Sequence, residues 1–180
     1  MKLVLNRYVR AALLPLVFAL AGDAYAHVTL ESRSAEAGST YKAVFKVGHG
    51  CAGSPVRQIV VDIPDGVQGA KPMPKAGWQI EIEQTRLDRP YTSHGKSVAE
   101  DVTQVRWMGG PLPDAYYDEF VLVAKLPERV GMLYWKVSQV CEQGRIDWAE
   151  LPAAGSKLSD YRAPAAALEV VPKTGAEHSH

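Results

Sequence analysis

His27 follows directly on the tripeptide Ala24-Tyr25-Ala26, the small-x-small pattern that a signal peptidase cleaves. As the first residue of a processed chain, a histidine offers one metal ion two nitrogens, the α-amine and the δ nitrogen of its own ring. The α-amine has a pKa of only ~7.7 to 8, so it releases its proton to a metal near neutral pH at little cost. Amine and imidazole nitrogens in a planar arrangement favour copper(II), which also binds most strongly among the divalent first-row metals. His27 is therefore the first candidate ligand of a copper(II) site, and an incidental residue after the cleavage point is the alternative.

His49 is the second candidate ligand. It lies at the end of a predicted strand in the run Gly48-His49-Gly50-Cys51, where glycines permit close approach of the backbone. If the first two predicted strands pair, His49 and His27 converge at one end of the fold. The alternative is a loop histidine without a role, which is how we interpret His94 in a polar segment.

Trp148 and several carboxylates are candidates for the remaining positions of the site. Trp148 follows the second cysteine closely, so a disulfide would bring it near His49, where it could cap an axial face of the metal and exclude water. A tryptophan of the core is the alternative. Glu31 could supply an equatorial oxygen, as could Asp147 or Glu150, and a solvated surface charge is the alternative for each.

The chain contains two cysteines, Cys51 and Cys141. In an exported chain the default expectation is that they form a disulfide. A redox pair or a pair of thiolate metal ligands is the alternative, but the C-x-x-C spacing typical of both is absent.

Residues 1–26 have the layout of a cleavable secretory signal, with a basic start, an apolar stretch over residues 11–21 and the small residues before His27. The apolar stretch has about half of the ~20 residues needed to span a bilayer, and no later segment is long and apolar enough. We therefore expect a periplasmic or secreted protein without a stable membrane anchor.

The charges balance, with 20 Lys and Arg against 20 Asp and Glu. Because no basic cluster is present, nucleic acid and anionic membrane surfaces are not expected partners. The length after cleavage suits one domain, over residues 27–172, and we expect residues 173–180 to form a disordered tail.

Short segments rich in β-branched and aromatic residues recur along the chain, separated by glycine, proline and aspartate. Apolar and polar residues alternate with period two, most clearly over residues 40–47, which is typical of half-buried strands. The sequence thus predicts an all-β fold, an antiparallel immunoglobulin-like β-sandwich, in which residues 85–102 form a long polar loop and residues 152–167 a crossing. The predicted strands are residues 27–30, 40–47, 58–63, 78–84, 103–107, 117–124, 131–140, 146–150 and 168–171.

Motifs of catalysis are missing from the sequence. It has no G-x-S-x-G elbow, no phosphate-binding glycine loop and no H-E-x-x-H pair. The sequence does not predict an enzyme.

Several strings in one order resemble the YcnI-type family of copper-binding domains. They are residues 27–30 (HVTL), 48–55 (GHGCAGSP), 71–78 (KPMPKAGW) and 112–120 (LPDAYYDEF), followed by Trp148, and the match runs from His27 to about Pro172. The resemblance implies a β-sandwich that binds copper(II) through a single-histidine brace at the processed N-terminus, with a carboxylate ligand and a neighbouring tryptophan. His27 matches the brace and Trp148 matches the tryptophan.

This sequence departs from the family pattern at the carboxylate. In members that use one, the acid falls in the loop after the second strand, where this chain has His49-Gly50-Cys51. Either His49 replaces the acid, or Glu31 or another carboxylate completes the site.

The leading hypothesis is a copper(II)-binding protein that buffers the metal or hands it to a periplasmic copper chaperone or copper transporter. The second is an interaction module whose sandwich surface binds a protein, with His27 incidental. The third is a copper oxidase, because two-histidine braces can activate oxygen.

Overall fold

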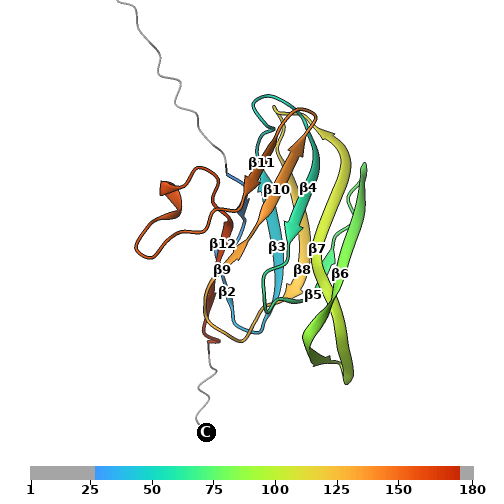
Figure 1. Ribbon diagram of the computed structural model, residues 1–180, viewed down its shortest axis with the longest axis vertical. Coiled ribbons are helices and arrows are strands. Elements are labelled where there is room, and N and C mark those ends of the chain that lie inside the picture. Colours follow the sequence, from blue (N-terminus) through green and yellow to red (C-terminus); the bar gives the residue numbers. More distant parts are fainter. Residues whose placement is uncertain (1–26, 175–180) are drawn as a thin grey trace, which may run out of the picture.

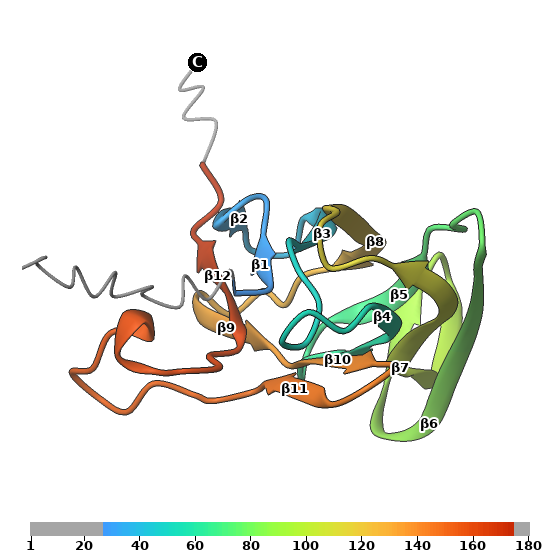
Figure 2. The ribbon, with the colours of Figure 1, turned by 90° about the horizontal axis from the view of Figure 1, so that it is seen from above.

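The computed structural model describes residues 27–174, which form two β-sheet layers with a third, smaller sheet at one side (Figures 1 and 2). The first layer has the strand order β1-β3-β8-β5, the second β11-β10-β4-β7-β6, and the small sheet β2-β12-β9. The strands are β1 (Thr29–Leu30), β2 (Ser34–Glu36), β3 (Thr40–Val47), β4 (Val56–Asp62), β5 (Gln68–Pro72), β6 (Trp78–Ser93), β7 (Lys96–Leu112), β8 (Asp118–Lys125), β9 (Gly131–Trp135), β10 (Val137–Cys141), β11 (Arg145–Trp148) and β12 (Ala166–Val171), with a short 3₁₀ helix η1 (Leu158–Asp160) before β12.

The predicted fold class is confirmed. Strand β3 has the predicted bounds, and its alternate residues Tyr41, Ala43, Phe45 and Val47 are buried between the layers. Neighbouring strands are antiparallel except for β2 and β12, which run parallel. The sandwich follows from this alternation, because each sheet has one apolar face that must be covered by the other.

Aromatic side chains fill the space between the layers. Phe45 and Trp135 contact edge to face with ring centroids 5.6 Å apart, and Phe120 meets Trp78 and Trp107 in the same way at 4.9 and 5.7 Å. Burying a side chain of this size stabilises the fold by about 1.5 to 3 kcal/mol. The Phe120 contacts join the two layers, and the Phe45 contact joins the first layer to the small sheet.

The prediction of a polar loop over residues 85–102 was wrong. These residues continue β6 and β7 into a long hairpin that closes with Ser93 opposite Lys96, and His94 and Gly95 form its two-residue turn with φ of 47° and 75°. Positive φ at both positions is the geometry that matches the twist of two hairpin strands. The hairpin escaped prediction because its outer end is largely exposed, with only scattered residues such as Tyr91 and Val98 half-buried, so little apolar alternation is required there.

Three further details differ from the predicted strands. The short edge strands β2 and β5 were not predicted, and the predicted strand over residues 131–140 is interrupted at Lys136. The two halves of that segment, β9 and β10, join different sheets. The crossing over residues 152–167 is present, with η1 within it and β12 beginning slightly earlier than predicted.

The predicted signal over residues 1–26 and most of the predicted tail lie outside the described residues. Within residues 27–174, no helix has the length and apolar character needed to cross a membrane.

The predicted disulfide is confirmed. Cys51 and Cys141 are bonded, with their Cα atoms 6.0 Å apart and a sequence separation of 90. Cys51 lies in the loop after β3 of the first layer, and Cys141 ends β10 of the second. The bond therefore ties the two layers together at one end of the sandwich.

Replacing both cysteines, in the variant Cys51→Ser with Cys141→Ser, should lower the free energy of unfolding by about 4 kcal/mol, because the bond restricts a long loop in the unfolded chain. Urea unfolding of the oxidised protein and the double variant measures the difference. A loss below about 1 kcal/mol would show that packing alone holds the two layers together.

Tyr41 should make the fold sensitive to alkali. Its side chain is 5% exposed, its hydroxyl donates to the Ser32 carbonyl at 2.9 Å, and burial, helped by the charge of Glu31, raises its pKa from 10.0 to about 12. Since the fold favours the neutral phenol, this contribution to stability is complete below pH 10 and is lost as the pH rises toward 12. Tyr41→Phe should cost about 1 kcal/mol at pH 7 and flatten the loss of stability above pH 10.

Thermal unfolding from pH 7 to 12 tests this, with Tyr116→Phe as the matched control because Tyr116 is 64% exposed. An equal alkaline loss of stability in Tyr41→Phe and in the unaltered protein would contradict the assignment to Tyr41.

Candidate functional site

The pairing of β1 with β3 brings His27 to the loop that carries His49. Thr29 lies opposite Lys46 in an antiparallel register, so the residues before β1 lie beside those after β3. Val28 and Leu30 are buried and fix this segment to the core. Both histidines therefore lie at the same end of the sandwich.

Trp148 lies beside both histidines. Its ring centroid is 5.5 Å from that of His27 and 6.4 Å from that of His49, with interplanar angles of 78° and 71°. Trp148 ends β11, where it lies opposite Val137 of β10, and it is fully buried at 0% exposed. The indole thus forms an apolar wall that the two imidazole rings approach edge to face.

His49 has one ring nitrogen that lacks a partner. Its Nδ1 lies at hydrogen-bonding distance from the Gly50 carbonyl, whereas Nε2 is buried without a hydrogen bond. A buried polar atom left unpaired costs about 1 to 3 kcal/mol and is rare in folded proteins. This nitrogen is therefore the strongest indication of a ligand among the predicted site residues.

The backbone around His49 is held by contacts on two sides. Gly50 donates its amide proton to Asp114 Oδ1 at 2.8 Å, and Cys51 and Ser54 exchange backbone hydrogen bonds of 3.0 Å. A Cβ at Gly50 would lie 1.9 Å from the Ser54 carbonyl oxygen, so the close turn requires glycine here. Asp114 was not predicted as a site residue, although it lies in the string at residues 112–120 that carries the family resemblance.

Gln139 is the second residue of the site that sequence reasoning missed. It lies in the middle of β10 and is 1% exposed. Its amide nitrogen donates to the His49 carbonyl at 2.6 Å, and its amide oxygen accepts a hydrogen bond from Trp148 Nε1 at 3.0 Å. The one available signal was a polar residue at an inward position, between Val137 and Cys141, where alternation favours an apolar side chain.

Among the described residues, the candidate carboxylates do not form a metal-binding group with the two histidines. Glu31 is exposed, and its charge acts on Tyr41 and Tyr117. Glu150 accepts a hydrogen bond from the Ala163 amide. Across residues 27–174, no three or more His, Cys, Asp or Glu side chains form a group that could hold a metal ion.

Asp147 is engaged on the outer face of β11. A hydrogen bond from the Ser138 hydroxyl at 2.6 Å and an ion pair with Arg145 at 2.7 Å hold its pKa below its ordinary value. Trp148, the next residue along the strand, faces inward. Asp147 therefore points to the side of the strand opposite the histidines.

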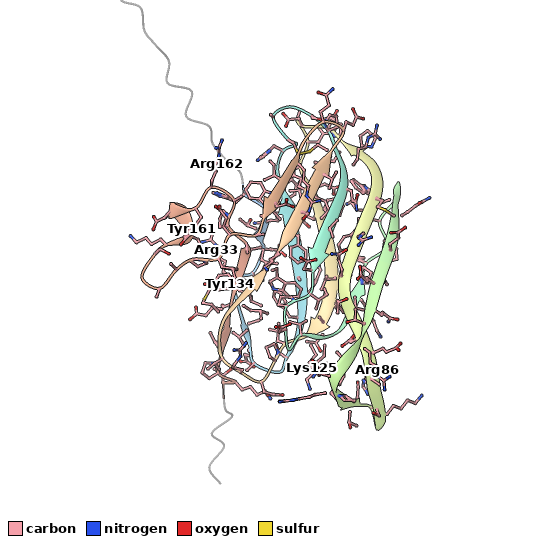
Figure 3. The ribbon with its side chains drawn as sticks, viewed as in Figure 1. Arg33, Arg86, Lys125, Tyr134, Tyr161 and Arg162 are labelled. Atoms are coloured by element: carbon pink, nitrogen blue, oxygen red, sulfur yellow. A yellow bond between two sulfur atoms is a disulfide. The ribbon has the colours of Figure 1, made fainter. Side chains whose placement is uncertain are left out.

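A groove lies beside His27, between the segment that carries β1 and the segment that leads into β12. It is lined by His27, Thr29, Met132 and Leu158 among others, and Arg33 lies at its wall. Arg33 and Tyr161 lie on this side of the molecule in Figure 3. His27 is thus reached from the surface, while Trp148 closes the inner side of the site.

The fold is similar to that of a solved structure described as an uncharacterized protein from Nocardia farcinica with an immunoglobulin-like fold. The two chains share 21% sequence identity with a TM-score of 0.61, over 80% of this chain and 97% of that one. No curated protein matches the chain. A family model described as a domain of unknown function (DUF1775) matches residues 27–170, and the chain therefore belongs to this family, the YcnI-like family.

Proposed function

We propose that this protein is exported, is cleaved before His27 and binds copper(II) at the end of the sandwich that carries His27, His49 and Trp148. The observation that carries the proposal is the buried Nε2 of His49, which has no partner and belongs to a ring that faces the same indole as His27. The processed His27 would contribute its α-amine and Nδ1, and His49 would contribute Nε2.

The donor set is consistent with the arrangement of side chains. A brace needs only two histidines, because the terminal residue supplies two nitrogens by itself, so a cluster of three acidic or thiol side chains is not required. Imidazole and amine nitrogens suit copper(II), whose bound ion would supply the missing partner for the buried nitrogen of His49. The cysteines are bonded to each other and are not available as thiolate ligands.

The role that we propose is copper handling rather than oxidation. Trp148 is fully buried and blocks the inner side of the site, which leaves one side open to the surface groove. A site of this kind suits uptake and release of an ion by buffering, trafficking or delivery to a periplasmic copper chaperone or copper transporter. The near-neutral balance of charge argues for protein partners over nucleic acid.

Extending the N-terminus by one residue tests the brace. We expect protein that begins at His27 to bind copper(II) with a nitrogen-rich tetragonal electron paramagnetic resonance signal. An added glycine before His27 turns the α-amine into an amide and should weaken binding at least ~100-fold, because one residue no longer chelates the ion. Competition titration and the resonance spectrum measure both effects. Equally weak binding by the two proteins would move the function to the sandwich surface and leave His27 incidental.

Removing the ring of His49 tests the third ligand. His49→Ala should lose one nitrogen from the copper(II) spectrum and bind the ion ~10- to 100-fold more weakly. Thermal unfolding is measured alongside, because the ring also packs against Trp148 and its Nδ1 lies at hydrogen-bonding distance from the Gly50 carbonyl. His94→Ala is the matched control, since His94 lies in the turn between β6 and β7. A spectrum of His49→Ala identical to that of the control would exclude His49 as a ligand.

A further inference from the structure

We infer that Gln139 is a positioning residue of the copper site, which holds the His49 backbone and the Trp148 indole in fixed relation to each other. The inference rests on the proposed function and adds a residue that does not touch the metal. Gln139 and Asp101 are the two buried polar side chains of the described residues, and Gln139 alone of the two lies beside the site.

The strand that carries Gln139 is fixed on both sides. Within β10, Gln139 lies opposite Ile59 of β4 and Ile146 of β11, so its backbone is paired in the interior of the second layer. Its side chain points inward with those of Val137 and Cys141. A side chain on such a backbone is a rigid support for a loop from the opposite layer.

The amide has one possible orientation. Trp148 Nε1 can only donate a hydrogen bond, so the Gln139 atom 3.0 Å from it is the oxygen. The amide nitrogen must then face the His49 carbonyl, which can only accept, and it lies 2.6 Å away. The two contacts together therefore identify which atom of the Gln139 amide is the oxygen and which is the nitrogen.

This bridge controls His49 through its backbone. The Nε2 atom of the His49 ring makes no hydrogen bond and Nδ1 contacts the carbonyl of the adjacent Gly50, so the direction of the ring depends on how this stretch of backbone is held. The Asp114 contact and the disulfide hold the next two residues, Gly50 and Cys51, and Gln139 holds the His49 carbonyl itself. The same side chain orients the indole against which both imidazoles pack.

The chemistry of the bridge requires a group that donates on one side and accepts on the other. Methionine has a similar size but does neither strongly, so it would leave the His49 carbonyl and the Trp148 N–H unpaired. A carboxylate could accept from Trp148 but would repel the His49 carbonyl. Glutamine meets both requirements without bringing a charge into the interior.

The test uses the mature protein that begins at His27 and its variants Gln139→Met and Gln139→Glu, with copper(II) as the probe. Asp101→Asn is the matched control, because Asp101 is 7% exposed and accepts hydrogen bonds from the Gly69 amide, the Tyr91 hydroxyl and the Val102 amide, away from the site. All three variants should unfold at lower temperature. Only the Gln139 variants should bind copper(II) about 10- to 100-fold more weakly and change its electron paramagnetic resonance spectrum.

A double-mutant cycle with Trp148→Phe shows whether Gln139 acts through the indole. The phenyl ring keeps an apolar wall but has no N–H, so the losses in copper affinity from Gln139→Met and Trp148→Phe should not add. Fully additive losses would contradict the bridge.

The outcomes separate the inference from the proposed function. Unchanged copper affinity and spectrum in both Gln139 variants, beside tight binding by the unaltered protein, would overturn the inference alone. Equal losses of affinity in Asp101→Asn would overturn it too, because a general loss of stability would then explain the effect. Absence of tight copper(II) binding by the unaltered protein would overturn the proposed function, together with the inference that rests on it.

Discussion

The covalent bond between Cys51 and Cys141 is the constraint on which the geometry of this end of the molecule depends. It joins the loop after β3 to the end of β10, two segments that belong to different layers of the sandwich. His49 lies two residues before Cys51, and Gln139 lies two residues before Cys141. The bond therefore keeps the loop that carries His49 against strand β10, which carries Gln139. This closeness allows the hydrogen bond from Gln139 to the His49 carbonyl.

The polar atoms at this end of the core divide into satisfied and unsatisfied ones. Gln139 and the indole nitrogen of Trp148 satisfy each other, and the His49 carbonyl is paired as well. His49 Nε2 has no partner in the same surroundings. Folded proteins rarely leave buried polar atoms unpaired, so the unpaired nitrogen beside the paired Gln139 and Trp148 is the observation that points to a ligand here.

The strands that could be predicted from the sequence are those with one buried and one exposed face. Strand β3 shows alternation over its whole length, and its predicted bounds agree with the structure. The outer end of the β6 and β7 hairpin is largely exposed, so its residues show no clear alternation of this kind. The break at Lys136 was equally hidden, because β9 and β10 are continuous in local character and differ only in the sheet that each joins.

Three properties could be taken from the amino-acid sequence alone: the place of His27 after a cleavage pattern, the one possible pairing of two cysteines, and the alternation that requires two layers. The three-dimensional fold was needed to show that His49, Gln139 and Trp148 meet, that Asp114 supports the loop, and that Glu31 is exposed. The contacts that hold the His49 loop join residues 64 and 90 positions apart in sequence. Such contacts depend on which strands pair and on which face of each sheet is buried. The local pattern of apolar and polar residues does not specify which strands pair or which faces meet.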